Sequence, residues 1–187
     1  MLKSEIRKEF LSIRRKINSK DREILNSKIF DYIKQSDVYN QSNTILIYVS
    51  TDDEVDTRKL IEYSLKIGKQ VYVPVTDYKT HTMQFYSIRS IKELTICKHG
   101  IYEPVPTPEK LYNSAKNSLC IVPAIVFSRI GYRVGYGGGY YDRFLSKFNG
   151  ISVGICYNQM ICDSFVAESH DIAVNMLATE HGFIRLS

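Results

Sequence analysis

The fold is decided by the stretch Arg133-Val134-Gly135-Tyr136-Gly137-Gly138-Gly139-Tyr140-Tyr141-Asp142-Arg143, which follows the apolar run Leu119 to Phe127. Four of the ten glycines of the chain fall within five consecutive residues of this stretch, 135–139. Apolar side chains then recur at three- and four-residue spacings between Tyr141 and Phe148, which is the pattern of one helix face. The sequence therefore predicts a strand, a glycine-rich turn and the start of a helix, in that order.

Outward from this stretch, helical stripes and short apolar runs alternate along the chain. An apolar stripe predicts an N-terminal helix, and further helices are expected at 19–35 and from about residue 57 to Gly68. The predicted strands are Thr44 to Val49, Gln70 to Val75 (ended by Pro74), Thr82 to Tyr86, Leu119 to Phe127, Ile151 to Cys156, Ile172 to Val174 and Met176 to Ala178. This alternation predicts an α/β fold of three layers, a largely parallel sheet covered by helices on both faces.

The bulk properties predict a cytoplasmic protein, and they do not demand a nucleic-acid partner. At 187 residues, with 44% hydrophobic and 24% charged side chains, the chain is expected to form a single domain, 1–187. It has no recognisable signal peptide and no apolar stretch long enough to span a bilayer. The net charge of +5 favours anionic ligands. Acidic residues interleave with the basic ones throughout, which argues against a nucleic-acid-binding face.

The glycine-rich turn is suited to binding a phosphate. Glycines allow positive φ angles and a close approach of the backbone to a ligand. The first N–H groups of a helix lack partners within the helix and carry the positive end of its dipole. Arg133 and Arg143 add charge on both sides. A tight turn without a ligand is the alternative, because neither the P-loop ending nor a complete G-x-G-x-x-G is present.

Ionisable side chains elsewhere supply the other candidates. Glu54 comes just past the strand at 44–49, where open α/β sheets place ligand contacts, so it and the glycine-rich turn can share one edge of the sheet. Asp142 either favours the helix dipole or binds Mg²⁺ beside a phosphate. Lys3, Arg7 and Arg14 form a ridge on the first helix, and by itself a solvated basic flank is the favoured interpretation.

No protein nucleophile is evident. The chain contains no G-x-S-x-G, and its cysteines show neither C-x-x-C pairing nor zinc-ligand spacing. His81, His99 and His181 form no recognisable metal or triad spacing and are expected to be structural or exposed. The chemistry is therefore expected to rest on phosphate handling.

Several motifs, in order along the chain, resemble those of the 5-formyltetrahydrofolate cyclo-ligase family, also called methenyltetrahydrofolate synthetases. The strongest is Gly131-x-Arg133-x-Gly135-x-Gly137-Gly138-Gly139-Tyr140-Tyr141-Asp142-Arg143-Phe144-Leu145. The others are Lys3-x-x-x-Arg7, Glu54-Val55-Asp56-Thr57, Gly100-Ile101-x-Glu103-Pro104 and His170-Asp171. The chain departs from the family pattern at Ala124 and Ser128, where glycine and aspartate are usual.

The resemblance implies an ATP- and Mg²⁺-dependent enzyme that cyclises 5-formyltetrahydrofolate, with or without a polyglutamate tail, and acts as a monomer. It implies that ATP contacts Lys3, Ser4, Glu5, Ile6, Arg7, Arg133, Val134, Gly135, Tyr136, Gly137, Gly138, Gly139, Tyr140 and Tyr141. It implies that the folate contacts Val49, Glu54, Tyr136, Gly137, Gly138, Gly139 and Tyr140. Asp142 and Asp171 are the implied magnesium ligands, and Arg133, Tyr140 and Asp142 the implied catalytic residues. A relative with the same ATP site but another substrate remains the alternative.

Overall fold

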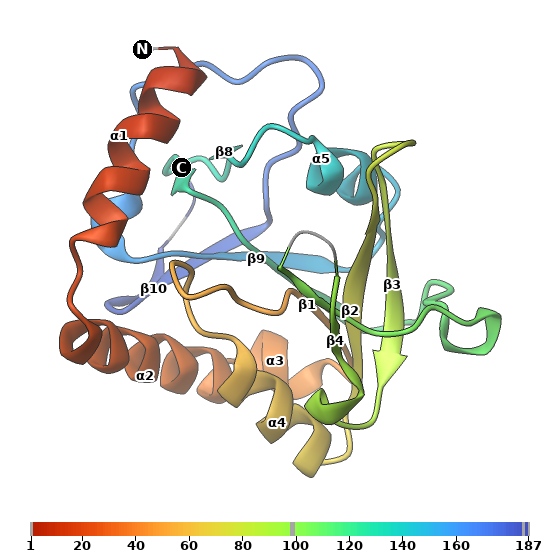
Figure 1. Ribbon diagram of the computed structural model, residues 1–187. Helices are drawn as coiled ribbons and strands as arrows, with labels where there is room; N and C mark the ends of the chain where they lie inside the picture. The colour runs from red at the N-terminus through yellow and green to blue at the C-terminus, as the bar shows by residue number, and fades with distance from the viewer. Residues whose placement is uncertain (1, 98–99, 185, 187) are drawn as a thin grey trace.

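The computed structural model describes residues 2–97, 100–184 and 186; His99, expected to be structural or exposed, lies outside them. Within this part of the chain, a seven-stranded sheet has the order β11-β10-β9-β6-β1-β2-β3 (Figure 1). Its strands are β1 (Thr44–Ile47), β2 (Gln70–Asp77), β3 (Thr82–Ile88), β6 (Ser118–Val122), β9 (Ile151–Ile155), β10 (Met176–Thr179) and β11 (Gly182–Ile184). Neighbours from β10 to β2 pair in parallel, and β3 and β11 are antiparallel edge strands.

Helices cover both faces of this sheet. They are α1 (Lys3–Arg15), α2 (Ser19–Gln35), α3 (Asp37–Gln41), α4 (Arg58–Lys66) and α5 (Tyr140–Leu145). In Figure 1, α2, α3 and α4 lie below the sheet, and α1 and α5 lie on its other side. The predicted three-layer α/β fold is confirmed. No helix in the described residues is both long enough and apolar enough to cross a membrane.

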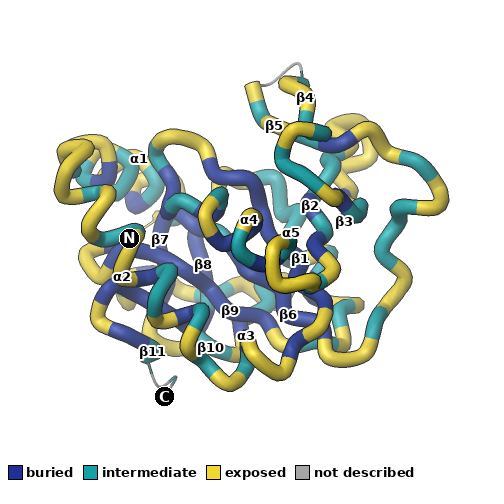
Figure 2. The backbone as a smooth tube through the Cα atoms, turned by 90° about the horizontal axis from the view of Figure 1, so that it is seen from below, coloured by how far each residue is buried: buried dark blue, intermediate teal, exposed yellow. Residues whose placement is uncertain are grey.

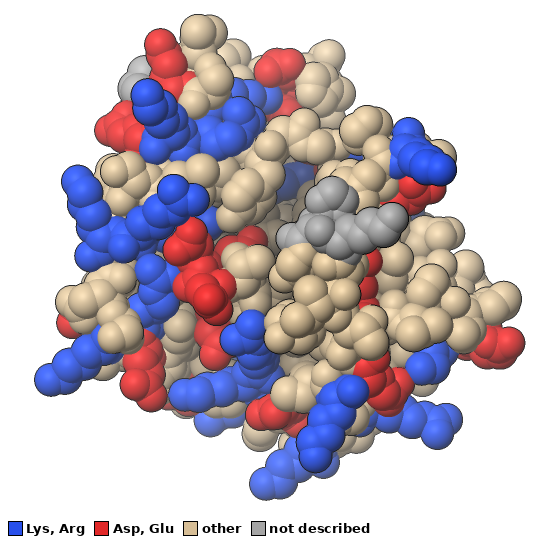
Figure 3. Space-filling view, viewed as in Figure 1, with Lys and Arg blue, Asp and Glu red and all other residues tan. Residues whose placement is uncertain are grey.

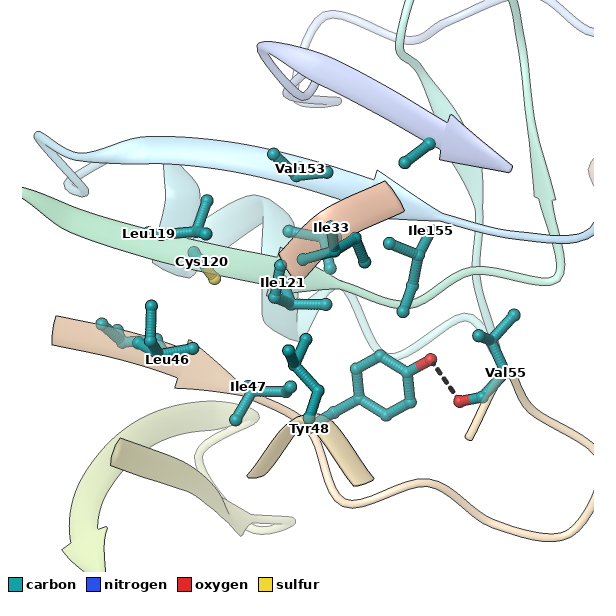
Figure 4. Close-up of a cluster of buried hydrophobic side chains, with 14 of the residues drawn as sticks. Ile33, Leu46, Ile47, Tyr48, Val55, Leu119, Cys120, Ile121, Val153 and Ile155 are labelled. Atoms are coloured by element: carbon teal, nitrogen blue, oxygen red, sulfur yellow. Dashed lines mark hydrogen bonds between the residues drawn. The ribbon is translucent and has the colours of Figure 1, made fainter. Parts of the chain in front are cut away.

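The central strands are buried on both faces. Every residue of β1 and of β6 is buried, because an unbroken apolar run suits a strand covered by a layer on each side (Figure 2). Figure 4 shows Leu46, Ile121 and Val153 from three adjacent strands within this core. Just beyond β1, the Tyr48 hydroxyl donates to the carbonyl of Val55 at 2.9 Å and fixes the start of the next loop (Figure 4).

Several predicted strands differ in extent: β1 ends at Ile47 and not at Val49, β3 continues to Ile88, and two further differences have a clear cause. The run Leu119 to Phe127 divides into β6 and β7 (Val126–Phe127), because Pro123 has no N–H to continue the ladder. β7 leaves the main sheet and pairs with β8 (Arg133–Val134). The second prediction, that Gln70 to Val75 ends at Pro74, fails because β2 continues to Asp77. Its pairing with β1 stops at Tyr72, so no ladder bond to β1 is required of Pro74.

The predicted strand Ile172 to Val174 is not formed. The N–H of Ile172 donates to the Asp142 carboxylate and that of Val174 to the carbonyl of Gly131, so neither enters a sheet ladder. A second small ribbon, β4 (Thr95–Ile96) with β5 (Tyr102–Glu103), stands outside the main sheet. Short 3-10 helices occur at Ile91–Glu93, Pro108–Lys110 and Asn158–Met160.

The order of the strands creates a switch point between β1 and β6. From β1 the chain continues outward through β2 to β3, and from β6 it continues in the opposite direction through β9 and β10. Loops leaving the carboxyl ends of β1 and β6 therefore diverge there. In open α/β sheets such a divergence is where ligands bind.

Candidate active site

The glycine-rich turn, residues 135–139, joins β8 to α5 and lies at the surface. Gly137 and Gly139 have φ angles of 100° and 64°, in the left-handed region that favours glycine. Gly139 is the N-cap residue of α5, so the unpaired N–H groups of the first helical turn adjoin the glycines. The predicted sequence of strand, turn and helix is confirmed, except that the strand before the turn is the short β8.

Helix α1 reaches this turn from the other end of the chain. The Nε of Arg7 donates to the carbonyl of Gly135 at 2.8 Å. A Cβ added to Gly137 would lie 3.6 Å from the Arg7 guanidinium, so arginine and turn are in close contact. Ser4 and Glu5 are exposed, whereas the Ile6 side chain is fully buried in a small core with Val134. The structure thus brings Arg7 to the turn and turns the Ile6 side chain away from it.

Arg133 and Asp142 form a largely buried ion pair behind the turn. Nη2 of Arg133 lies 2.7 Å from Oδ1 of Asp142, and the two side chains are 5% and 20% exposed. The same Oδ1 accepts from the N–H of Ile172, and Nη1 of Arg133 donates to the Ile172 carbonyl. This bonding holds Asp171, the preceding residue, near Asp142.

Asp171 is held by Lys3. The Lys3 Nζ lies 2.6 Å from Oδ2 of Asp171, and the N–H of Glu168 donates to the same oxygen. Burial raises the pKa of Asp171, but the hydrogen bonds from Lys3 and Glu168 outweigh it, and the net pKa is below its usual value. Asp171 is therefore a carboxylate at neutral pH.

The two carboxylates fit a magnesium ion that is shared with a phosphate. Mg²⁺ is commonly held by one or two carboxylates, with phosphate oxygens and water completing the shell. Asp142 and Asp171 supply that number: Asp142 accepts from the N–H of Ile172, and Asp171 is the residue before Ile172 in the chain. Among the described residues, no group of three or more His, Cys, Asp or Glu side chains could hold a metal ion.

Tyr140 and Tyr141 lie in different surroundings. The Tyr140 ring faces the β2–β3 hairpin, its centroid 6.1 Å from that of Tyr78 and 6.2 Å from that of His81. The Tyr141 hydroxyl is buried and has no hydrogen-bond partner in the described part of the chain. Burial raises the pKa of Tyr141 well above its usual value, so this hydroxyl remains a donor.

Glu54 lies at the switch point, beside a small cavity. The cavity is lined by the last residue of β9, by residues that follow β1, β6 and β9, and by one residue of α1: Arg14, Tyr48, Glu54, Val55, Pro123, Ala124, Ile155, Cys156, Tyr157 and Met160. Its volume is about 10 Å³, the space of one water molecule. Glu54 is 9% exposed and accepts from the N–H and the hydroxyl of Thr51. Val49 is buried in the main core and does not line the cavity.

Arg14 is the residue that the sequence interpretation placed wrongly. It was expected on a solvated flank, but it is 3% exposed. Nη1 donates to the carbonyl of Ala124 at 3.1 Å and Nη2 to the Tyr136 hydroxyl at 2.6 Å. A signal was available, because Phe10, Arg14 and Ile17 share the four- and three-residue spacing of one helix face. The carbonyl of Ala124 remains available whether residue 124 is alanine or glycine.

Ser128 has a local structural role. Its hydroxyl accepts from the N–H of Tyr132 at 3.2 Å, and its own N–H donates to the Tyr132 carbonyl at 2.8 Å. These bonds close the turn between β7 and β8. An aspartate at this position could accept the same N–H, so the departure from the family pattern leaves the turn intact.

Basic side chains cluster over α1 on the face that Figure 3 shows, at its upper left. Acidic side chains interrupt them, and the Lys3 ion pairs with Glu168 and Asp171 are examples of this mixing. The positive charge is thus gathered near the turn and does not form a continuous face.

Replacing Glu54 with glutamine is expected to stabilise the protein in a pH-dependent manner. Burial raises the pKa of Glu54 above the ordinary 4.5, although hydrogen bonds from Thr51 and the charge of Arg14 oppose the shift. Because the folded-state pKa is the higher one, ionisation of Glu54 opposes folding. This cost is absent below about pH 4.5 and appears as the pH rises through the folded-state pKa. Thermal unfolding of Glu54→Gln at pH 8 should give a melting temperature roughly 2–4 °C above wild type.

The difference between the two proteins should vanish towards pH 4.5. Asp53→Asn is a suitable control, because Asp53 is in the same loop and its side chain is 38% exposed. The quantity to compare is the melting temperature of Glu54→Gln minus that of wild type. A smaller value at pH 8 than at pH 4.5 would contradict the buried position of this carboxyl group.

Comparison with known proteins places the chain in a family. The model of the 5-formyltetrahydrofolate cyclo-ligase family matches residues 1–180. A probable 5-formyltetrahydrofolate cyclo-ligase of Caenorhabditis elegans is 29% identical over 150 residues, 78% of this chain and 73% of the relative. The 5-formyltetrahydrofolate cyclo-ligase of Escherichia coli K12 is 28% identical over 142 residues, 74% of this chain and 78% of the relative.

Comparison with solved structures gives the same family. The NMR structure of 5,10-methenyltetrahydrofolate synthetase from Aquifex aeolicus superimposes with a TM-score of 0.85 at 31% identity, covering 100% of this chain and 93% of that one. A 5,10-methenyltetrahydrofolate synthetase from Mycoplasma pneumoniae has the same fold, with a TM-score of 0.73 at 22% identity and coverage of 96% and 99%. The chain therefore belongs to the 5-formyltetrahydrofolate cyclo-ligase family and is an enzyme of that family.

Proposed function

We propose that this protein, acting as a monomer, catalyses the ATP- and Mg²⁺-dependent conversion of 5-formyltetrahydrofolate to 5,10-methenyltetrahydrofolate, with release of ADP and phosphate. The observation that carries the proposal is the meeting of three features at one edge of the sheet. They are an exposed glycine-rich turn, cations from α1 and β8, and two carboxylates. Family membership supplies the substrate class.

The reaction needs ATP because the formyl oxygen is a poor leaving group. Amide resonance reduces the electrophilicity of the formyl carbon, and the oxygen would have to leave as hydroxide or oxide. Transfer of the γ-phosphoryl group to this oxygen breaks the bond to ADP and leaves an activated, iminium-like carbon. N10 of the same molecule then attacks, the phosphate leaves with the former formyl oxygen, and N10 loses its proton to solvent. Holding both groups together supplies much of the acceleration.

The protein residues mainly position the substrates and neutralise charge. Backbone N–H groups of the turn, with Arg7 and Arg133, would bind the phosphates, and Lys3 would hold Asp171 in place. Asp142 and Asp171 are the groups that would hold Mg²⁺, which when bound neutralises phosphate charge during phosphoryl transfer. We assign Tyr140 to the same end of the site, at the first helical position after the turn.

The folate would lie between this turn and the loop after β1. Glu54 supplies a carboxyl group suited to the N–H groups of a pterin, and Val49 lies two residues beyond the end of β1. Tyr136 is 60% exposed and offers a flat ring between the turn and the Glu54 cavity. The glutamate tail of the folate, whether a single glutamate or a polyglutamate, would extend towards solvent.

An absorbance assay tests the function. Purified protein with 5-formyltetrahydrofolate, MgCl₂ and ATP should develop the near-ultraviolet absorbance of the methenyl product, and one ADP should form per product. Omitting ATP should abolish both signals. A folded sample that forms neither product nor ADP would refute the proposal, and ADP formation without the methenyl product would indicate a different acceptor.

A further inference from the structure

Within the part of the chain that the structure describes, Arg14 carries a buried charge without a charged partner. Its two bonded groups are the neutral carbonyl of Ala124 and the neutral hydroxyl of Tyr136. Its Nε is buried and has no hydrogen-bond partner in the described residues. Among these residues, no carboxylate oxygen lies within ion-pair distance of its guanidinium. A buried arginine with an unused N–H is costly, so such a group points to a partner that the folded chain alone does not supply.

The surroundings of Arg14 indicate where that partner would lie. Arg14 and Glu54 line the same cavity at the switch point, and Tyr48 and Tyr157, which follow β1 and β9, line it as well. The two side chains are close enough for the charge of Arg14 to lower the pKa of Glu54. The cavity therefore presents a donor and an acceptor that do not satisfy each other.

We propose that Arg14 is a folate-binding residue, whose Nε–H donates to the 4-oxo group of the pterin while Glu54 accepts from the adjacent N3–H and 2-amino group. In a pterin these three groups occupy neighbouring positions on one edge, in the order acceptor, donor, donor. An arginine beside a carboxylate matches that order, and neither side chain alone does. This assignment rests on the proposed function, because it takes the substrate to be a folate.

Tyr136 explains how the pocket can admit a ring. The cavity has room for only one water molecule, so a pterin requires it to widen. Tyr136 is largely exposed, and the 2.6 Å bond from Nη2 of Arg14 joins its hydroxyl to the cavity. Since the ring is not part of the core, it can move outward and release the guanidinium to the ligand. The alternative is a purely structural role, in which a buried water accepts from Nε and Arg14 only stabilises the loop after β6 through the carbonyl of Ala124.

Binding measurements on Arg14→Met separate these two roles. Methionine retains much of the apolar length and removes the donors. By calorimetry, the variant should bind 5-formyltetrahydrofolate about 10- to 100-fold more weakly, the effect of one hydrogen bond to a charged group. The dissociation constant for ATP with Mg²⁺ should change less than about threefold. Arg15→Met is the matched control, because the neighbouring Arg15 side chain is 66% exposed and forms a surface ion pair with Asp53.

A substrate analogue gives a readout that a structural role would not move. A 4-amino-4-deoxy analogue presents a donor where the folate presents the 4-oxo acceptor. Wild type should prefer the natural substrate, and Arg14→Met should lose about tenfold of that preference. Glu54 is present in both proteins, so its own response to the analogue cancels from the comparison.

The outcomes are distinguishable. A wild-type protein that binds no folate refutes the proposed function, and the role of Arg14 with it. Wild-type binding with equal affinity in Arg14→Met, or an unchanged preference for the 4-oxo group, refutes the role of Arg14 alone. Equal losses for folate and ATP would assign Arg14 to the structure of the loop. If Arg14→Met does not fold, Arg14→Lys decides: at least fivefold weaker folate binding with unchanged ATP binding is expected, and wild-type affinity would overturn the inference.

Discussion

Arg133→Ala is expected to reduce ATP affinity by about 100-fold or more and to abolish measurable turnover. Arg133 is 8% exposed and holds both the Asp142 carboxylate and the Ile172 carbonyl. Its removal leaves a largely buried carboxylate without its cation, a change that typically costs about 3–5 kcal/mol. It also removes positive charge next to the turn. Calorimetry with a non-hydrolysable ATP analogue, together with the absorbance assay, measures both effects.

Arg129→Ala provides the control for this variant. Arg129 lies four residues earlier and forms an exposed ion pair with Asp163, in which the two side chains are 62% and 50% exposed. Exposed pairs of this kind contribute at most about 1 kcal/mol, so the control should bind ATP and turn over as wild type does. Near-normal ATP affinity in a folded Arg133→Ala protein would show that the phosphates bind elsewhere.

Asp142→Asn is expected to lower turnover by about 100-fold or more while folate affinity changes less than about threefold. Asparagine retains an oxygen that can accept from Arg133 and from the N–H of Ile172, so the local structure should persist. What the variant loses is the negative charge that favours Mg²⁺. The Mg²⁺ concentration that gives half-maximal turnover should therefore rise, and titration of MgCl₂ in the absorbance assay measures it.

Glu168→Gln is the matched control for the loss of an acid near this site. Glu168 is 56% exposed and pairs with Lys3, which retains its contact with Asp171 in the variant. Its Mg²⁺ dependence should match that of wild type. Equal losses of folate affinity and turnover in Asp142→Asn would contradict a metal-binding role, because they would indicate a general disruption of the site.

Local patterns predicted the layers and the glycine-rich turn well. β1 and β6 are short runs in which every residue after the first is apolar, and such runs form covered parallel strands whatever their partners. Gly137 and Gly139 are required by their positive φ angles, which is a property of the chain within a few residues. These features depend on short-range physics, and the sequence is enough to predict them.

Features that depend on distant partners were predicted less well. Ile172 looks like a strand residue, but its N–H is taken by Asp142, thirty positions earlier in the chain. Arg14 looks like a surface residue, but the carbonyl of Ala124 and the hydroxyl of Tyr136 accept its protons inside the protein. Hydrophobic periodicity carries no information about such pairings, because it records which face is buried and not what meets it.

The site residues assigned by family resemblance fall into two groups: side chains that meet at the glycine-rich turn, and side chains that are buried in the core. Arg7, Arg133, Asp142 and Asp171 meet around the turn, through contacts that span most of the chain. Ile6 and Val134 are core residues, and they could contact a nucleotide only through their backbone. Position in a motif therefore indicates the neighbourhood of the site, and the structure decides which side chains face it.

The central claim is that residues 135–140 bind the triphosphate so that its terminal phosphate reaches the folate formyl oxygen. A crystal structure with a non-hydrolysable ATP analogue, Mg²⁺ and 5-formyltetrahydrofolate tests it most directly. The account predicts phosphate oxygens on the backbone amides of Gly137 to Tyr140, the metal between Asp142 and Asp171, and the formyl oxygen next to the γ-phosphate. A nucleotide bound at another edge of the sheet, with this turn free of phosphate, would contradict it.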